Sequence, residues 1–275
     1  MSTATKQTVG LLGAGRMGMP IIAHLVKAGF PVLVYDVDPS RKEDVETRGG
    51  SFAVDVAEVS RQCPIVLVCV GFEEQLNEIM FGEQGMLGQL PGGALVAVLS
   101  TVSPDGMKRL LAAAQEHGVD VVDAPVCRGS RAADTGTLLS LLGGTEAATA
   151  KFAPVADAYS ADVVRLGDIG AGQVGKAINN LIMWSCLVAN HEGLALAQRF
   201  GVDIETLRPA LQMSTAANQA LDNWGNQTMA WFEDDLEIIQ EMAVHTGISL
   251  PQAALNREIC RALKPRRYQL DKYGA

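Results

Sequence analysis

Gly13, Gly15 and Gly18 stand between the apolar run Val9 to Leu12 and a helical pattern of apolar residues. In that order the first glycine permits a tight turn, the second lets backbone N–H groups approach a pyrophosphate, and the third lets the helix lie close to the strand. Asp36 ends a second apolar run, 18 residues after Gly18. Its carboxylate can accept both hydroxyl groups of an adenosine ribose and would repel a 2′-phosphate. The four residues therefore predict a dinucleotide site that prefers NAD to NADP.

Lys176 is a second residue whose type and position suggest chemistry. It follows the glycine-rich segment 167–172, and Asn180 lies four residues further on, on the same face of a predicted helix. Removal of a hydride from an alcohol requires a base for the hydroxyl proton, and a lysine serves as one where burial lowers its pKa from about 10.4. For such a pair in isolation, the alternative is a helix-start lysine in water beside a capping asparagine.

These residues need elements that hold them, and the first part of the chain alternates strand and helix patterns. Continuous apolar runs separated by helical spacers are typical of parallel strands that are covered on both faces. The further predicted strands are Ile65 to Val70, Ala94 to Leu99, Val119 to Val122 and Gly136 to Leu142. We therefore predict an α/β fold in which residues 1–167 form a doubly wound, Rossmann-type parallel sheet domain that binds the dinucleotide.

From residue 168 to residue 275 the pattern is helical, and it predicts an all-helical domain for substrate binding and oligomerisation. The domain begins with a long helix, Gln173 to Phe200, whose apolar residues occupy most faces. Such a helix is usually buried, here between the domains or against another subunit. The other predicted helices are Ile204 to Leu211, Asp235 to Thr246 and Leu250 to Leu263.

The composition is that of a soluble enzyme rather than a nucleic-acid or membrane protein. The net charge of −9 and the isoelectric point near 5.0 argue against a polyanionic partner. The segment Met1 to Gln7 has no secretory pattern, and the apolar segment Leu181 to Ala189 is too short to span a bilayer. The 5 cysteines and 4 histidines show no metal-ligand spacing. We expect reduced thiols, no metal and a cytoplasmic location.

Three further segments join the glycine turn in a fixed order along the chain. They are Ser100 to Pro104, Asp123 to Val126 followed by Gly136 to Leu138, and Gly172 to Asn180. In this order and spacing the chain resembles the β-hydroxyacid dehydrogenases, the family of 3-hydroxyisobutyrate dehydrogenase and tartronate semialdehyde reductase. The resemblance covers essentially the whole chain. It implies a dinucleotide-binding domain, a helical second domain and an active site in the cleft between them.

The resemblance also implies the roles of individual residues. Lys176 is the general acid and base, and Asn180 acts beside it on the substrate. The residues implied to bind the cofactor are Gly13, Ala14, Gly15, Arg16, Met17, Gly18, Asp36, Val70 and Thr101. The residues implied to bind the substrate are Thr101, Cys127, Arg128 and Gly129, together with Lys176 and Asn180.

The chain departs from the family pattern at two places. Relatives usually continue the segment Asp123 to Val126 with Ser-Gly-Gly, whereas this chain has Cys127, Arg128 and Gly129. Arg128 either adds a cationic fork for a second anionic group of the substrate, or points to solvent or binds a neighbouring acid. Cys127 fills the place of the usual serine. Asp234 stands where relatives usually carry a lysine, so one cation is lost there and an anion is gained.

Together these features predict an NAD-dependent oxidoreductase that interconverts a small 3-hydroxy acid and its oxo acid or semialdehyde. The expected partners are a small anionic hydroxy acid and further copies of the chain, as a homodimer or homotetramer. One alternative is an NADPH-dependent semialdehyde or glyoxylate reductase, which Asp36 disfavours. Another is a catalytically impaired dinucleotide-binding protein, which the presence of Lys176 and Asn180 disfavours. Lys176 also argues against imine reduction, because imine reductases of this architecture generally replace that lysine.

Overall fold

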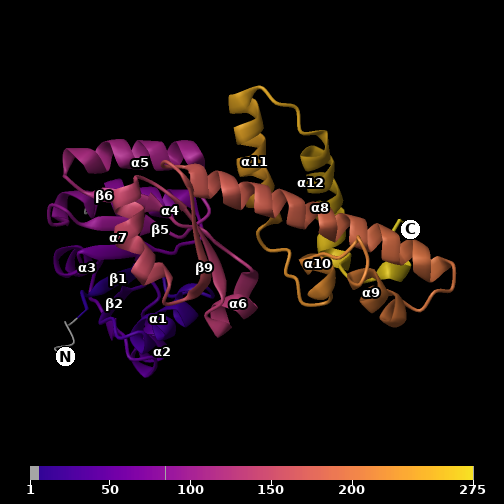
Figure 1. The fold of residues 1–275 in the computed structure, drawn as a ribbon, viewed down its shortest axis with the longest axis horizontal. Coiled ribbons are helices and arrows are strands. Elements are labelled where there is room, and N and C mark those ends of the chain that lie inside the picture. The colour runs from indigo at the N-terminus through magenta and orange to yellow at the C-terminus, as the bar shows by residue number, and fades with distance from the viewer. Residues whose placement is uncertain (1–5, 84, 275) are drawn as a thin grey trace. The chain divides into compact units, whose positions relative to one another are not determined.

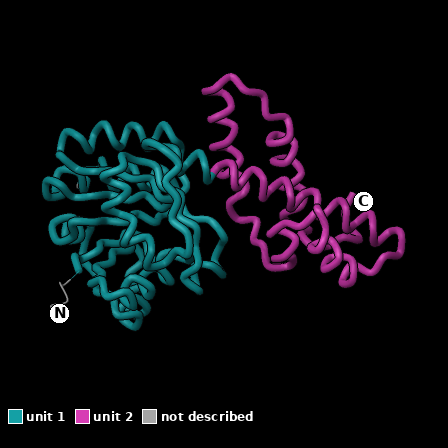
Figure 2. Tube along the Cα trace, in the orientation of Figure 1, with its two compact units in different colours: residues 1–176 teal, residues 177–275 magenta. Residues whose placement is uncertain are grey.

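The computed structural model describes residues 6–83 and 85–274, and the chain divides into two compact units (Figures 1 and 2). Unit 1 comprises residues 1–176, and unit 2 comprises residues 177–275. The sequence predicts the change of architecture at residue 167, where the last strand ends, whereas the units divide within the helix that follows.

Unit 1 is built on a mostly parallel sheet. Its strands are β1 (Val9–Leu12), β2 (Val32–Tyr35), β3 (Ser51–Phe52), β4 (Ile65–Val68), β5 (Leu95–Val98), β6 (Asp120–Asp123), β7 (Val126–Cys127), β8 (Leu138–Gly143) and β9 (Ser160–Gly167). The strand order is β3-β2-β1-β4-β5-β6-β8-β7, and β9 pairs with β8. The first six strands are parallel and have the doubly wound order that the sequence predicts. In such sheets ligands bind at the carboxyl ends of the strands. The binding crevice lies between β1 and β4, where the order of the strands along the sheet reverses.

The last strands of the sheet are not all parallel. β8 runs antiparallel to β6 and β7, and β9 runs parallel to β8. Asp123 at the end of β6 lies opposite Gly143, and Val126 of β7 lies opposite Ser140. The sequence predicts 136–142 as one of the parallel strands; the element is present, but its predicted direction relative to β6 is wrong. Apolar content indicates that a strand is buried but not which way it runs.

Helices cover both faces of the sheet of unit 1 (Figure 1). One face packs against α1 (Gly18–Lys27), α2 (Lys42–Thr47), α6 (Gly129–Thr135) and α7 (Glu146–Ala156). The other packs against α3 (Val56–Gln62), α4 (Glu73–Phe81) and α5 (Pro104–Glu116). Two short 3₁₀ segments, η1 (Pro39–Arg41) and η2 (Leu87–Gln89), lie in the connections. In β4, Ile65 and Leu67 enter one core while Val66 and Val68 enter the other. Burial on both faces explains why the strands are continuously apolar.

His24 connects helix α1, which follows the glycine turn, to helix α6. Its ring nitrogen Nε2 lies 3.0 Å from the carbonyl oxygen of Ala133. Gly136 ends α6 with φ +68° and passes directly beside the ring, where a Cβ would lie 2.8 Å from Cε1 of His24. A side chain at position 136 would push the ring away, so the glycine permits the contact between the two helices.

Unit 2 is helical. Helix α8 (Ala171–Arg199) begins in unit 1 and continues through unit 2, followed by α9 (Ile204–Gln212), α10 (Gln219–Asp222), α11 (Phe232–Thr246) and α12 (Pro251–Leu263). Two short 3₁₀ segments, η3 (Lys264–Arg266) and η4 (Leu270–Lys272), follow. The described residues of unit 2 contain no strand. Across residues 6–83 and 85–274, none of the helices combines the length and apolar character needed to cross a membrane.

Helix α8 buries one side within the chain and exposes apolar side chains on another. Trp184 and Leu187 are buried in the core of unit 2. Ile178 and Ile182 stay exposed, as does Leu196, of which 60% is accessible. The predicted burial of the remaining apolar side chains against a second copy of the chain stays a prediction.

His191 lies at the centre of an aromatic cluster in unit 2. Its ring centroid lies 4.5 Å from that of Trp224 and 5.4 Å from that of Tyr268. Nδ1 donates to the Leu187 carbonyl at 2.8 Å, and Nε2 accepts the backbone N–H of Tyr268 at 3.2 Å. Burial lowers the pKa of His191, although the hydrogen bond to Leu187 opposes this shift. The neutral ring therefore serves as a structural group with both nitrogens in use.

Candidate active site

The glycine turn has the geometry that a dinucleotide needs. Gly13 has φ +102°, and a Cβ on it would collide with the carbonyl oxygen of Cys69 in the neighbouring strand connection. A Cβ on Gly18 would collide with the carbonyl of Gly13, so the first turn of α1 approaches the strand end more closely than a side chain allows. A Cβ on Gly15 would meet no atom within 4 Å. The space above the turn is therefore open, as a pyrophosphate bound to backbone N–H groups requires.

Asp36 is held in place by two backbone donors. The N–H of Ala14 in the glycine turn donates to Oδ2 at 2.6 Å, and the N–H of Asp38 donates to Oδ1 at 2.9 Å. These bonds fix the plane of the carboxylate at the end of β2 and tie it to the turn. A carboxylate has about four acceptor sites, so lone pairs remain for the two hydroxyl groups of a ribose.

The other residues predicted to bind the cofactor lie around the same edge of the sheet. Arg16 is exposed and lies 3.4 Å from Asp134, while Met17 is partly buried against the core. Val70 follows β4, and its N–H donates to Ser100 Oγ at 2.9 Å. Thr101 follows β5 and is half-buried. The cofactor contacts themselves stay predictions.

Lys176 stands in the second turn of α8 and reaches the loop that is predicted to receive the substrate. Its Nζ donates to the carbonyl oxygen of Val126 at 2.8 Å, and its side chain is half-buried. Val126 belongs to β7, which leads directly into residues 127–129. The helix and the strand thus bring the predicted acid/base group and the predicted substrate loop together within unit 1.

Arg128 takes the second of the two orientations that the sequence leaves open. Its Nη2 forms an ion pair with Asp162 of β9 at 2.6 Å, and its Nη1 donates to the Thr137 carbonyl at 3.1 Å. The residue has φ 82° and ψ 0°, a left-handed conformation that favours glycine. The family pattern given above has glycine at this position. Gly129, the first residue of α6, also has a positive φ. A direct contact of Arg128 with the substrate stays a prediction.

Cys127 is buried near the cationic side chains of Lys176 and Arg128. Burial raises the pKa of its thiol, and the positive charges of Lys176 and Arg128 only partly oppose the shift. A thiol kept protonated is a poor nucleophile. This agrees with its interpretation as a small residue that fills the place of serine.

Two predicted residues lie in unit 2. Asn180 is buried one turn after Lys176 along α8, and its Oδ1 accepts the Asn179 side-chain amide at 3.0 Å. Asp234 is exposed in the first turn of α11. The neighbouring Asp235 accepts the indole N–H of Trp184 at 2.9 Å, which fixes α11 to α8.

Two functional candidates were not recognised as such in the sequence. Asp123 and Gln173 are both fully buried, and the Gln173 N–H donates to the Asp123 carboxylate at 2.9 Å. Both residues stand inside segments that carry the family resemblance. A buried acid directly after a strand is the signal that could have found Asp123. The partners of Gln173 are distant in sequence and leave no such signal.

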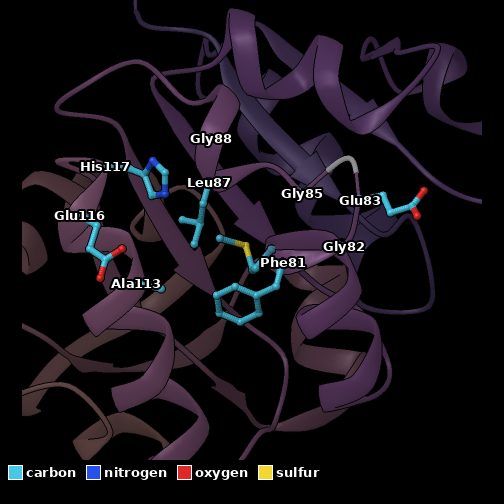
Figure 3. Close-up of a pocket in the computed structure, with 10 residues that line it drawn as sticks. Phe81, Gly82, Glu83, Gly85, Leu87, Gly88, Ala113, Glu116 and His117 are labelled. Carbon is cyan, nitrogen blue, oxygen red and sulfur yellow. The ribbon is translucent and has the colours of Figure 1, made fainter.

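The described residues contain no group of three His, Cys, Asp or Glu side chains that could hold a metal ion. A surface hollow lies between the end of α4, η2 and the end of α5, where Phe81, Leu87 and His117 line it (Figure 3). The end of α5 leads into the start of β6, so this hollow lies at the amino-terminal edge of the parallel strands. The glycine turn lies at the opposite, carboxyl edge, and the hollow is not part of that site.

The fold and the site define a dinucleotide-binding domain of an oxidoreductase, followed by a helical unit. Residues 8–167 match the family model for the NAD binding domain of 6-phosphogluconate dehydrogenase. Residues 170–272 match the family model described as NAD-binding of NADP-dependent 3-hydroxyisobutyrate dehydrogenase. The chain belongs to the β-hydroxyacid dehydrogenase family of NAD(P)-dependent enzymes. The family and the fold class predicted from the sequence are therefore confirmed.

Individual proteins show how far the similarity extends. The chain is 30% identical over 214 residues to 3-hydroxyisobutyrate dehydrogenase of Pseudomonas aeruginosa, covering 78% of this chain and 72% of that one. It is 28% identical to 2-(hydroxymethyl)glutarate dehydrogenase of Eubacterium barkeri, covering 91% and 87%. A solved structure of 3-hydroxyisobutyrate dehydrogenase from Mycobacterium tuberculosis with L-serine has the same fold, with a TM-score of 0.84, 23% identity and 94% coverage of both chains.

Proposed function

We propose that this chain is an NAD-dependent dehydrogenase of small 3-hydroxy acids in which Lys176 is the general acid and base. The observation that carries the proposal is the place of the Lys176 ammonium, 2.8 Å from the Val126 carbonyl at the entrance to the loop 127–129. The side chain is anchored by a neutral group, and no carboxylate partner within the described residues forms an ion pair with it.

The glycine turn and Asp36 fit the cofactor. The open space over Gly15 suits the pyrophosphate, and the anchored carboxylate of Asp36 suits the ribose hydroxyls. A 2′-phosphate would meet the negative charge of Asp36, which supports NAD rather than NADP. When bound, the nicotinamide supplies the acceptor or the donor of the hydride.

Lys176 handles the proton. In oxidation its Nζ takes the proton of the substrate hydroxyl, and in reduction it returns that proton to the forming alkoxide. Both the neutral amine and the ammonium form of Lys176 can donate a hydrogen bond to the Val126 carbonyl. The carbonyl can therefore hold Nζ in place before and after the proton is transferred. The lone pair or the remaining protons stay available to the substrate. Asn180, one turn further along α8, supplies an amide for the substrate.

The substrates of the similar dehydrogenases share one chemical unit, which supports a substrate class for this chain. 3-Hydroxyisobutyrate, 2-(hydroxymethyl)glutarate and L-serine, for which three relatives are named as dehydrogenases, all carry a primary hydroxyl group on the carbon next to the one that bears a carboxylate. We infer that this chain binds the same unit and forms a semialdehyde. Thr101, Cys127, Gly129 and the main chain of Arg128 are the groups proposed to meet the rest of the substrate, because Asp162 and the Thr137 carbonyl hold the guanidinium of Arg128.

The test is a panel of these three acids with NAD and with NADP, read by the formation of reduced nicotinamide. We expect activity with at least one acid and a loss of about 10²–10⁴-fold in kcat for Lys176→Ala. The affinity for NAD should stay within about twofold, because the glycine turn and not Lys176 holds the phosphates. Lys108→Ala, at an exposed position on α5, is the matched control. A Lys176→Ala variant that keeps more than about a tenth of the rate would contradict the proposal.

We further propose that the chain forms a homodimer or homotetramer through the exposed apolar side of α8. Ile178, Ile182 and Leu196 form that side in unit 2. Exposed apolar groups of this kind on one helix support contact with another copy of the chain.

A further inference from the structure

Asp123 is a carboxylate with no access to solvent at the end of β6. Its Oδ1 accepts the N–H of Gly170 at 2.7 Å, and its Oδ2 accepts the N–H of Gln173 at 2.9 Å. Burial raises the pKa of Asp123, and the backbone hydrogen bonds oppose that shift. The group thus satisfies the free N–H groups at the start of α8 from a strand that is 47 to 50 residues away in sequence.

Two glycines leave just enough room for this carboxylate. A Cβ on Gly143 would collide with Asp123 Oδ1, and a Cβ on Gly172 would lie 2.7 Å from Oδ2. The carboxylate therefore has one position, enclosed between β8 and the first turn of α8. A serine on the helix itself could cap α8 locally, but it would not tie the helix to the edge of the sheet.

Gln173 continues the connection to the neighbouring strand end. Its side chain is buried, with Nε2 donating to the Ser100 carbonyl at 2.8 Å and Oε1 accepting the Val102 N–H at 3.2 Å. Ser100 Oγ in turn accepts the N–H of Val70 after β4. Asp123 and Gln173 thus join the first turn of α8 to the carboxyl ends of β4, β5 and β6.

Lys176 follows Gln173 by three residues, which is about one turn of the same helix. We propose that Asp123 and Gln173 are positioning residues that fix the rotation and height of this turn and thereby hold Lys176 Nζ at the Val126 carbonyl. This inference rests on the proposed role of Lys176 as acid and base. The network lies entirely in unit 1, so a shift of the first turn of α8 would move Nζ directly relative to the substrate loop.

Two substitutions of Gln173 test the network without enlarging the side chain. Gln173→Met keeps the length and removes both hydrogen bonds. Gln173→Glu keeps an acceptor for Val102, but its ionised form sets a second oxygen against the Ser100 carbonyl, whereas its protonated form donates to that carbonyl as the amide does. Burial raises the pKa of the introduced carboxyl above the usual value of about 4.3, so both forms are accessible in an assay.

We expect kcat to fall about 10- to 100-fold in Gln173→Met at every pH, because a displacement of about 1 Å has that effect. In Gln173→Glu, kcat at low pH should approach that of the native protein measured at the same pH. As the pH rises and the introduced carboxyl ionises, kcat should fall below that of the native protein. Asp123→Asn should lower kcat as well, because its amide presents a donor to one of the two backbone N–H groups. The affinity for NAD should stay within about twofold of the native value in the Gln173 variants.

A readout without cofactor is the rate at which trinitrobenzenesulfonate modifies Lys176, followed by peptide mass spectrometry. Gln173→Met should increase that rate severalfold, because Nζ loses its fixed place on Val126. Asp55→Ala is the matched control, since it removes a helix cap in unit 1, the Asp55 bond to the Glu58 N–H, away from this network. It should lower stability without changing kcat, its pH profile or the modification rate.

The outcomes separate this inference from the proposed function. If Lys176→Ala is inactive while both Gln173 variants match Asp55→Ala in kcat and in modification rate, the positioning role is refuted and the role of Lys176 stands. If Lys176→Ala is active, the proposed function and the positioning role both fail. A pH-dependent recovery of Gln173→Glu that Gln173→Met lacks would support the positioning role, because a general loss of stability does not produce it.

Discussion

Substitution of Arg128 separates the energy of its backbone from that of its side chain. The residue has φ 82° and ψ 0°, a conformation that costs a residue with a Cβ about 1–2 kcal/mol and glycine almost nothing. The guanidinium offsets part of that cost through Asp162 at 2.6 Å and the Thr137 carbonyl at 3.1 Å. Because 54% of the Asp162 side chain is exposed, the ion pair contributes only about 0.2–1 kcal/mol.

The two simplest variants should therefore differ in stability. Arg128→Ala loses both the ion pair with Asp162 and the hydrogen bond to the Thr137 carbonyl and keeps the strained backbone, so its free energy of unfolding should fall by about 0.5–1 kcal/mol. Arg128→Gly loses the same contacts but relieves the strain, so it should lie about 1 kcal/mol above the alanine variant and close to the native protein. Urea unfolding followed by circular dichroism is the appropriate assay, because all three tryptophans lie in unit 2 and report poorly on the loop.

The double variant with Asp162→Ala completes the test. The coupling energy between positions 128 and 162 should be about 0.2–1 kcal/mol. Equal stabilities of Arg128→Gly and Arg128→Ala would refute the argument from backbone strain. With the guanidinium held by Asp162, kcat/KM of Arg128→Gly should change by the same factor for 2-(hydroxymethyl)glutarate and for 3-hydroxyisobutyrate. A much larger loss for the first, a diacid, would instead place Arg128 beside the second carboxylate.

Three further predictions follow from other parts of the chain. Asp36→Asn should narrow the preference for NAD over NADP, measured as the ratio of kcat/KM values, because the charge opposite a 2′-phosphate is removed. Because the pKa of His191 is lowered in the folded protein, the unfolded chain binds a proton at this residue more readily. The contribution of His191 to the free energy of unfolding should therefore be constant above about pH 6.5 and fall as the pH drops below that value. Urea midpoints at several pH values measure this, and His191→Phe should remove that part of the pH dependence. Ile182→Glu should convert a dimer or tetramer into monomers in light scattering, whereas a native protein that is already monomeric would contradict the oligomer.

The sequence predicts those features that local patterns encode. Burial on both faces makes β4 and β5 continuously apolar, and this pattern locates them within two residues. The glycine turn and Asp36 are set by the requirements of a tight turn and a strand end, so spacing alone identifies them. The direction of β8 depends instead on a pairing with β6 across the sheet, which no local pattern records.

The site is less predictable where contacts join distant parts of the chain. The Gln173 side chain bonds residues that precede it by 71 and 73 positions, and Arg128 finds Asp162 in a strand that the sequence analysis did not predict. Lys176 could be named from its motif, but its anchor on the Val126 carbonyl required the structure. Sequence patterns thus name the reactive group, whereas the tertiary fold decides what holds it in place.

The contact of His24 with Ala133 has a consequence for redesigning the selectivity of this protein. It clamps the far end of the segment that begins with Cys127 and Arg128 to the helix behind the glycine turn. The tip of that segment can then be varied while its frame remains in register with the cofactor side of the domain. Substitutions at position 128 should therefore mostly leave the segment folded, whereas the same substitutions at His24 or Gly136 should yield mostly variants whose loop has lost its support.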